Sequence, residues 1–264
     1  MLQVEIASRC EVGGRSHNED DLRHGQSGSF CYAVLSDGAG GHRGGAIASD
    51  IVVRMTTLGL QSATQATPDE LTRIACEAND ALLQKQDKSS RDRMHATLVA
   101  LWIDAQAEEA LWTHVGDSRL YMLRHGRVAH VTQDDSVVQR MVAAGYLTPE
   151  EALAHPQKNQ LLSAMGTEDG IEPNTVPGLV PLQDGDAFLL CSDGWWDHFH
   201  NDDIETTFAT STSPEEWLAL MADNIQHAAK TRQDNYSAIA VWVGNPAETT
   251  RFSTVWGETV PHPL

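Results

Sequence analysis

The sequence predicts an α+β fold in which antiparallel sheets are flanked by helices. Short apolar runs that are typical of strands follow one another closely, and some are separated only by a hairpin turn. Segments with helical spacing come in pairs between these groups and do not alternate singly with the strands, which disfavours a doubly wound parallel sheet. The chain has 264 residues, 41% of them hydrophobic, without a linker or low-complexity tract, as is typical of an ordinary globular protein.

The expected strands are apolar runs of strand length bounded by turn residues. A hairpin turn at 124–127, which contains Gly126, joins two of them. The runs are 2–10, 30–36, 95–104, 110–116, 119–124, 127–131, 186–192 and 237–243.

The expected helices show apolar residues at helical spacing. Thr67 and Pro68 precede the segment 69–88 and supply a capping side chain and a proline near its start. The stretch 145–180 is rich in Pro, Gly and polar residues, so we expect it to be irregular, and we expect the tail from about 246 to be poorly ordered. The helical segments are 44–61, 69–88, 134–145 and 214–230.

The charge of the chain bears on its partners. Thirty-seven acidic and 18 basic residues give a net charge of −19 at pH 7. Such a chain repels a phosphate backbone unless its basic residues cluster, and none do. We therefore expect no nucleic-acid partner.

The compartment follows from cysteine spacing and hydropathy. The four cysteines are scattered without a Cys-x-x-Cys pair, which argues against a zinc ribbon or a disulfide scaffold. No apolar run approaches the roughly 18 residues of a membrane span, and the N-terminus lacks the pattern of a signal peptide. We expect a cytoplasmic protein without a membrane partner.

The tripeptide Ser-Asp-Gly occurs twice, each time at the end of an expected strand. Its aspartates are Asp37 and Asp193, and we expect the glycine after each to let the chain turn sharply. Asp117 follows another expected strand, and Asp234 precedes one. If these strands lie side by side, the four carboxylates form a cluster, although each of them alone would suit an ordinary turn.

Clustered carboxylates favour a metal site. They repel one another, and their pKa values rise unless a cation offsets the charge. Mg²⁺ or Mn²⁺ suits such a site because both prefer oxygen ligands and keep several waters. Two such ions about 3.5–4 Å apart can share a water, lower its pKa and direct it at a phosphoryl group.

A charged loop near the N-terminus could complete this site. Arg15 could grip phosphate oxygens through its planar fork, while Glu19 and Asp20 could hold metal-bound waters; alone, this would be an ordinary charged loop. The glycine-rich run that begins at Gly38 is not a dinucleotide fingerprint, because Arg43 stands where the third glycine belongs. Its glycines more simply let backbone carbonyls approach a metal.

Five motifs in order resemble those of the bacterial metal-dependent phosphatases of the protein phosphatase 2C family. The resemblance implies a four-layer α-β-β-α sandwich with two central antiparallel sheets and the site in a cleft at one edge. It implies a phosphatase domain over 1–246, a flap at about 133–170 and a separate tail at 247–264. The motifs are Arg15-x-x-Asn18-Glu19-Asp20, Asp37-Gly38-Ala39-Gly40-Gly41-His42, Gly116-Asp117-Ser118-Arg119, Ser192-Asp193-Gly194 and Asp234-Asn235.

The resemblance also implies roles for the acidic residues. Asp37 would bridge two Mn²⁺ or Mg²⁺ ions, with the Gly38 carbonyl as a further ligand. Asp193 and Asp234 would complete the shell of the first ion. Asp117, together with Asp193, matches the position that holds a third ion in bacterial relatives.

The implied activity is that of a Mn²⁺- or Mg²⁺-dependent protein-serine/threonine phosphatase. Glu19 and Asp20 would act through bound waters, and Arg15 would bind the phosphate of phosphoserine or phosphothreonine. A hydroxide that bridges the ions would attack phosphorus in line, so that Arg15, Asp37 and Asp193 are the expected catalytic residues. We expect phosphorylated proteins as substrates, a cognate bacterial Ser/Thr kinase as the opposing enzyme, and a monomer.

The chain departs from the family pattern at three places. Relatives carry Met or His at the position of Ala39, and that His can protonate the leaving group. With Ala39 the general acid is open between His42 and a metal-bound water. Relatives often have His at Asp135 and an Arg near the end of the flap, where this chain reads Ser-Ala-Met-Gly at 163–166.

Two other functions compete with this one. A catalytically inactive relative could bind phosphoproteins as a scaffold, but it would not need every predicted metal ligand. A two-metal hydrolase could act on nucleic acid or on small phosphoesters, and the net charge disfavours nucleic acid.

Overall fold

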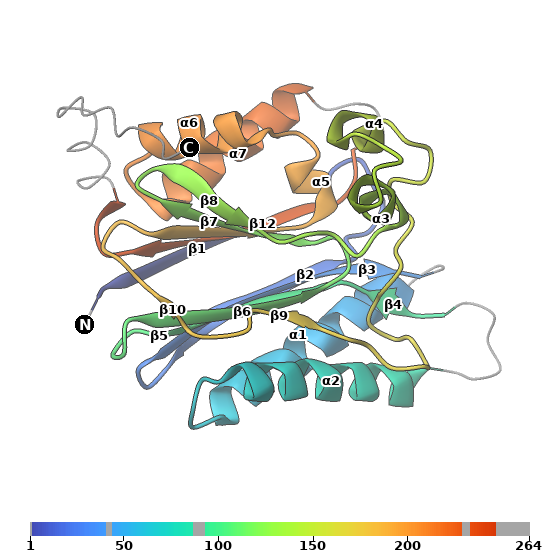
Figure 1. Ribbon diagram of the computed structural model, residues 1–264, viewed down its shortest axis with the longest axis horizontal. Helices are drawn as coiled ribbons and strands as arrows, with labels where there is room; N and C mark the ends of the chain where they lie inside the picture. Colours follow the sequence, from blue (N-terminus) through green and yellow to red (C-terminus); the bar gives the residue numbers. More distant parts are fainter. Residues whose placement is uncertain (1, 41–43, 87–92, 229–232, 247–264) are drawn as a thin grey trace.

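In the computed structural model, the described part of the chain forms two antiparallel sheets packed face to face, with helices on both outer faces (Figure 1). This order of layers confirms the predicted four-layer α-β-β-α sandwich. Among the described residues, no helix is long and apolar enough to cross a membrane. The structure describes residues 2–40, 44–86, 93–228 and 233–246. The predicted tail at 247–264 and His42 lie outside these ranges.

The lower sheet in Figure 1 has the strand order β10-β6-β5-β3-β2, with β9 paired to β6 and β4 paired to β3. The run expected at 95–104 is divided into two strands, β4 and β5, which are separated at Thr97. Strand β2 was not predicted because its sequence is mostly polar, yet it pairs with β3 along its whole length. The strands are β2 (Asp20–Ser27), β3 (Phe30–Ala39), β4 (His95–Ala96), β5 (Leu98–Asp104), β6 (Glu109–Val115), β9 (Asn174–Thr175) and β10 (Val180–Pro181).

The upper sheet has the order β1-β12-β11-β7-β8, and all of its strands correspond to predicted runs. The predicted hairpin between β7 and β8 is confirmed: His125 and Gly126 have φ angles of 53° and 73°, as a tight two-residue hairpin turn requires. The strands are β1 (Val4–Glu11), β7 (Arg119–Arg124), β8 (Arg127–Val131), β11 (Ala187–Cys191) and β12 (Tyr236–Val243).

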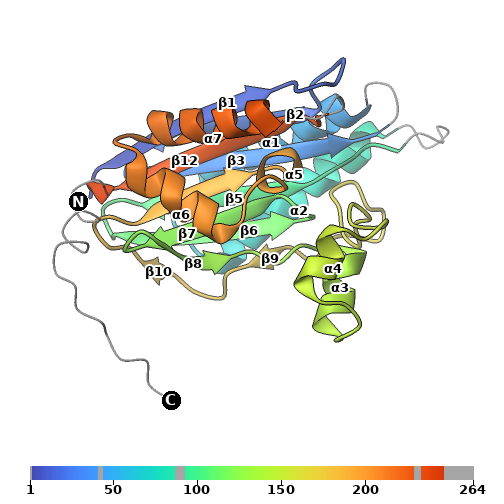
Figure 2. The ribbon, with the colours of Figure 1, turned by 90° about the horizontal axis from the view of Figure 1, so that it is seen from above.

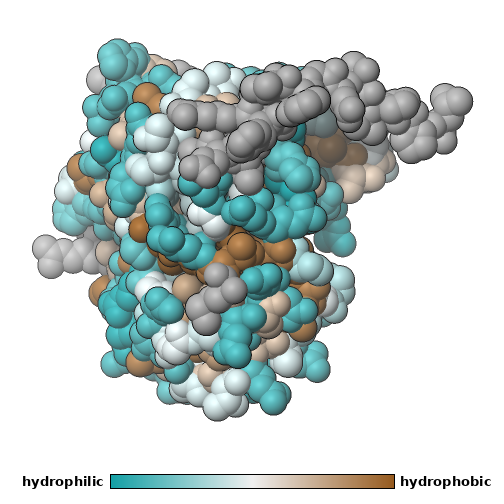
Figure 3. Space-filling model, turned by 90° about the vertical axis from the view of Figure 1, so that its left-hand side faces the viewer, coloured by the Kyte–Doolittle hydropathy of each residue, from teal (hydrophilic) through white to brown (hydrophobic). Residues whose placement is uncertain are grey.

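Alternating side chains divide the core into three apolar layers. In β11, Phe188 and Leu190 point into the layer between the sheets, while Leu189 and Cys191 face the helices. In β3, Leu35 faces the other sheet in the same way. Figure 3, which shows the end of the molecule on the left of Figure 1, has a band of apolar side chains between two mostly polar regions. Strands buried on both faces explain why so many of them read as continuous apolar runs.

The helices cover the outer faces of the sheets. Helices α1 (Gly44–Ser62) and α2 (Pro68–Lys85) pack on the lower sheet, and α6 (Asn201–Thr210) and α7 (Pro214–Ala228) pack on the upper one (Figure 1). Helix α2 begins as predicted, because Thr67 accepts a hydrogen bond from the backbone of its first turn. Helix α6 was not predicted, since its first turn is polar.

The predicted flap connects β8 to β9 and lies at one end of the sandwich (Figure 2). It contains α3 (Val137–Ala143) and α4 (Pro149–Leu153), so the helix expected at 134–145 is shorter than predicted. A single turn of helix, α5 (Asp193–Trp196), follows β11 near this end. The catalytic candidates gather here.

Candidate active site

A pocket of about 290 Å³ brings most of the predicted site residues together. Segments that are far apart in sequence meet there: the N-terminal loop, β3, β4, the turn between β6 and β7, the flap, α5 and the loop just before β12. Asp20 does not line the pocket; it is buried in β2, opposite Asp37 of β3. The predicted residues that line it are Arg15, Glu19, Asp37, Gly38, Asp117, Asp193 and Asp234.

The first Ser-Asp-Gly lies inside a strand. Strand β3 continues through Asp37 and Gly38 to Ala39, so the sharp turn expected after Asp37 is wrong. Gly38 instead allows two other backbone segments to lie close to β3. A Cβ at Gly38 would lie 2.1 Å from the carbonyl oxygen of Gly45, at the start of α1, and 2.7 Å from that of Glu19. The backbone therefore needs a glycine here for packing, not for a left-handed conformation.

The second Ser-Asp-Gly begins a helix. Ser192 precedes α5, and Asp193 is its first residue. A Cβ at Gly194 would lie only 2.0 Å from the carbonyl oxygen of Asn235, which directly follows Asp234. The absent side chain of Gly194 thus lets the loop that carries Asp234 lie against the start of α5. Both glycines bring a second backbone segment close to an aspartate.

Four aspartates form what we call the acidic cluster: Asp20, Asp37, Asp117 and Asp193. Burial raises the pKa of Asp20 to about 7, of Asp117 to about 8 and of Asp193 to about 6. Burial and the charges of the other aspartates raise the pKa of Asp37 well above its usual value. These carboxylates cannot all be ionised near neutral pH without a compensating positive charge.

The acidic cluster fits divalent cations. Asp20 and Asp37 are direct cross-strand partners, and like charges in that arrangement destabilise a sheet. Ser192 Oγ donates to Asp20 Oδ2 at 2.9 Å, while the buried Asp20 Oδ1 has no hydrogen-bond partner. Among the described residues, no three His, Cys, Asp or Glu side chains converge closely enough to enclose an ion by themselves. The carboxylate oxygens of the cluster suit hard cations such as Mg²⁺ or Mn²⁺, which prefer oxygen ligands and keep several waters.

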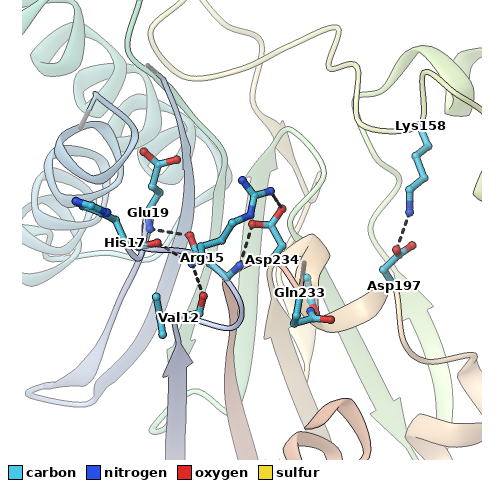
Figure 4. A network of polar contacts seen from close by, with 10 residues as sticks. Val12, Arg15, His17, Glu19, Lys158, Asp197, Gln233 and Asp234 are labelled. Carbon is cyan, nitrogen blue, oxygen red and sulfur yellow. Dashed lines mark hydrogen bonds and ion pairs between the residues drawn. The ribbon is translucent and has the colours of Figure 1, made fainter. Parts of the chain in front are cut away.

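Arg15 lies at the opening of the pocket. Its Nη2 donates to Asp234 Oδ2 at 2.7 Å, and more than half of its side chain is exposed (Figure 4). The predicted phosphate-binding residue thus pairs with a predicted metal ligand. This ion pair offsets one acidic charge at the edge of the cluster and keeps the guanidinium beside the pocket.

Asn235 holds the loop that carries Arg15. Its Nδ2 donates to the carbonyl oxygens of Val12 at 2.9 Å and His17 at 3.0 Å. Its Oδ1 accepts from the backbone N–H of Glu19 at 2.9 Å. Figure 4 shows Val12, His17 and Glu19 around Arg15 and Asp234. One buried amide therefore fixes the N-terminal loop to the start of β12.

The flap is anchored by two of its aspartates. Asp134 receives two hydrogen bonds from Arg119, both at 2.8 Å, and the guanidinium of Arg119 stacks 3.5 Å from the ring centre of Trp196. Asp135 accepts from the backbone N–H of Gly116 at 3.0 Å. The departure at Asp135 therefore has a structural role, which is to tie the base of the flap to the strand end before Asp117.

Other residues of the flap contact the end of α5 or line the pocket. Lys158 Nζ donates to Asp197 Oδ2 at 2.6 Å (Figure 4), and Asn159 and Leu161 line the pocket. At 163–166, where relatives carry an Arg, the backbone of Met165 is bonded to β4 instead. The flap thus contributes polar and apolar atoms to the pocket.

Sequence reasoning missed several residues of this pocket. His95, Thr97, Asn159 and Leu161 line it but carry no local signal, because each is brought there by long-range pairing or by the flap. Asn235 adjoins a predicted ligand, and only the structure shows what its amide holds. We call Arg15 together with His95, Asn159 and Leu161 the rim residues.

The sequence profile described as Protein phosphatase 2C matches residues 11–233. The chain belongs to the protein phosphatase 2C family. This confirms the resemblance that the five motifs indicated, and the pocket that gathers those motifs lies within the matched region. The individual roles of the site residues stay predictions.

Named relatives agree with this assignment. Protein phosphatase PhpP of Streptococcus pneumoniae is 34% identical over 232 residues, which cover 84% of this chain and 92% of that protein. The crystal structure of the serine/threonine phosphatase PstP/Ppp of Mycobacterium tuberculosis superposes with a TM-score of 0.81 at 28% identity, covering 93% of this chain and all of that one. A PstP catalytic domain in complex with two manganese ions has a TM-score of 0.80 at 26% identity, with 93% of this chain and all of that chain covered.

Proposed function

We propose that this protein hydrolyses phosphoserine and phosphothreonine in proteins, with two Mn²⁺ or Mg²⁺ ions held at the acidic cluster. The observation that carries the proposal is the convergence of Asp37, Asp117, Asp193 and Asp234 on one pocket beside Arg15. Their mutual repulsion calls for cations, and the arginine offers a site for a phosphate anion. We take residues 1–246 as the phosphatase domain.

Different residues of the chain are suited to hold the ions directly or through water. Asp37, the Gly38 carbonyl, Asp193 and Asp234 are suited to hold the ions, with Asp117 available for a third. Glu19 and the buried Asp20 would contact them through water. When bound, the ions would supply positive charge that lowers the pKa of a water and neutralises phosphate oxygens.

Arg15 is suited to hold the substrate. Its guanidinium presents paired N–H donors that match two phosphate oxygens. It is exposed enough to meet a phosphorylated side chain that enters from solvent. Neutralisation of Asp234 by an ion would weaken its attraction for Arg15, so that the guanidinium could turn to the phosphate instead. Binding and orientation of the phosphate are the tasks that we assign to this residue.

The biological setting follows from the reaction class. A phosphoserine or phosphothreonine substrate must be made by a Ser/Thr kinase, which would be the enzyme that this protein opposes. We propose that the protein acts as a monomer, because the residues that we assign to the ions and the phosphate need no second copy to complete the site. A scaffold that only binds phosphoproteins is the competing function.

Hydrolysis of a phosphothreonine peptide separates these two functions. We expect phosphate release with Mn²⁺, loss of release with EDTA, and loss in the Asp193→Asn variant. Asp197→Asn is the matched control, because Asp197 is an exposed carboxylate that pairs with Lys158 outside the pocket. Peptide binding without any metal-dependent turnover in the parent protein would contradict the enzyme and favour the scaffold.

A further inference from the structure

The reaction proposed for this pocket needs a proton donor. When the phosphorus–oxygen bond of a phosphothreonine breaks, the side-chain oxygen leaves as an alkoxide unless a proton reaches it. An alkoxide is a poor leaving group in water near neutral pH, so a positioned acid lowers the barrier substantially. None of the residues assigned above supplies this proton.

The described residues that line the pocket offer few candidates. Its carboxylates are the proposed ion ligands, and a carboxylate that neutralises a cation has no proton to give. The guanidinium of Arg15 is not deprotonated in proteins. The hydroxyl of Thr97 accepts from the backbone N–H of Asp37 at 2.9 Å and lies 2.7 Å from Ser118 Oγ, and a hydroxyl is a weak acid. This leaves the imidazole of His95, a side chain type that exchanges protons near neutral pH.

The sheet places His95 opposite the end of β3, on the wall of the pocket. His95 of β4 is the direct cross-strand partner of Ala39 at the end of β3. Directly paired residues in an antiparallel ladder project their side chains from the same face, with Cβ atoms about 5 Å apart. Both residues line the pocket, and the methyl group of Ala39 leaves space on that face for the larger ring of His95.

A carbonyl oxygen of the flap determines which ring nitrogen of His95 is engaged and which is free. His95 Nδ1 lies 3.3 Å from the carbonyl oxygen of Met165, and a carbonyl can only accept, so Nδ1 carries the hydrogen of this contact. Met165 is itself bonded to Ala96 in both directions, at 2.8 and 3.3 Å. Among the described residues, no hydrogen bond occupies Nε2. The ring is thus oriented from one side and open on the other.

We propose that His95 is the general acid of this active site, which rests on the proposed phosphatase function. A water oxygen forms a bond to phosphorus, the bond from phosphorus to the serine or threonine oxygen breaks, and Nε2–H of the imidazolium gives its proton to that oxygen. The products are hydrogen phosphate and the free hydroxyl side chain. The proton that the attacking water loses returns the imidazole to its charged form through solvent.

Two substrates that differ in their leaving group test this role. In a phosphothreonine peptide the leaving group is the threonine alkoxide, which needs the acid. In p-nitrophenyl phosphate it is a stabilised phenolate, which does not. In His95→Ala we expect kcat for the peptide to fall by about 100-fold, within the range of general acid catalysis, and kcat for p-nitrophenyl phosphate to change less than about threefold. His95→Gln keeps the size of the side chain and should behave alike.

A matched control and a relocation variant sharpen the test. His227 of α7 also contacts a backbone carbonyl through Nδ1, at 2.7 Å from Asp223 O, but lies outside the pocket, so His227→Ala should leave both substrates unaffected. Ala39→His in the His95→Ala background returns an imidazole to the same face of the ladder. We expect peptide turnover in this double variant to be at least about tenfold faster than in His95→Ala.

The outcomes separate this role from the proposed function. If the parent protein with Mn²⁺ hydrolyses neither substrate, the phosphatase function fails and the role of His95 fails with it. If both substrates slow equally in His95→Ala and His95→Gln, the residue is structural. Full peptide turnover in His95→Ala would overturn the role of His95 as general acid and leave the proposed phosphatase function in place. The same holds if the relocation variant shows no recovery while p-nitrophenyl phosphate still turns over.

Discussion

The acidic cluster and the rim residues belong to the same site, but they are held in different ways. Most of the cluster lies on regular backbone: Asp20 and Asp37 are strand residues and Asp193 begins a helix, while Asp117 lies in the turn between β6 and β7. The rim is held mostly by loops and by contacts between distant segments, such as the bond from His95 to the flap. The cluster is acidic and is buried at Asp20 and Asp117 and half-buried at Asp37 and Asp193, whereas the rim offers cationic, polar and apolar groups at the opening.

This difference suggests a division of labour. A buried set of carboxylates is suited to hold ions at fixed positions and would be needed by any substrate. Exposed groups at the opening are suited to contact the phosphate and its leaving group. Changes in the cluster should therefore abolish all activity, while changes in the rim should affect substrates unequally.

Asp37→Asn should have the largest effect. Loss of the charge that we propose to hold the ions would remove several kcal/mol of stabilisation from the reaction, so kcat should fall by about 10³-fold or more for every substrate. The measurement is Mn²⁺-dependent turnover of both a phosphopeptide and p-nitrophenyl phosphate. A loss confined to one of the two substrates would contradict the division between cluster and rim.

Gly194→Ala tests how the cluster is framed. The new methyl carbon would lie 2.0 Å from the carbonyl oxygen of Asn235, so the loop with Asp234 must move. We expect the free energy of unfolding to fall by about 2–3 kcal/mol, measured by urea denaturation. Gly178→Ala is the control, since a Cβ there meets nothing within 4 Å. Equal stability of both variants would show that the close approach is not needed.

Stability without metal should fall with rising pH. The folded pKa values of Asp193, Asp20 and Asp117, at about 6, 7 and 8, lie above the ordinary value of a carboxyl group. Such groups stabilise the fold fully only below the ordinary pKa of about 4, and this contribution is lost progressively as pH rises from there through the folded pKa values, up to about 8. Added Mn²⁺ should replace the lost protons, so its stabilising effect should be larger at pH 8.5 than at pH 6 by about 1–2 kcal/mol.

Thermal unfolding with and without Mn²⁺ at both pH values checks this prediction. EDTA-treated samples give the metal-free reference. An equal effect of Mn²⁺ at pH 6 and pH 8.5 would mean that these aspartates do not contact the ions.

Arg15→Ala should have a smaller effect, limited to the rim. Its side chain is more than half exposed, so any hydrogen bonds to phosphate would form in contact with solvent. We therefore expect KM for a phosphopeptide to rise about tenfold with little change in Mn²⁺ affinity. Arg9→Ala, which alters an exposed arginine of β1 outside the pocket, is the control. Unchanged steady-state kinetics in Arg15→Ala would remove its assigned role.

The sequence was informative about the cluster for a physical reason. Asp37 and Asp193 stand next to apolar runs that identify buried strands, so their place within or directly after a buried strand could be inferred locally. Asp20 was harder, because β2 is polar and its pairing with β3 is not visible in its own composition. The turn assigned to Gly38 was wrong because the sequence does not show which backbone approaches it.

The rim was largely hidden from sequence reasoning. His95 meets Ala39 across a ladder that joins segments 56 positions apart, and nothing near either residue indicates that pairing. Asn159 and Leu161 reach the pocket only through the course of the flap. Arg15 was found because it belongs to a motif, yet its contact with Asp234 was not foreseen.

The central claim is that the acidic cluster binds two divalent ions, and calorimetric titration of the metal-free protein with Mn²⁺ tests it most directly. We predict two ions per chain near pH 8, and a loss of at least one of them in Asp37→Asn, with both proteins folded as judged by circular dichroism. Failure of the parent protein to bind Mn²⁺, or the same stoichiometry in both proteins, would contradict the account.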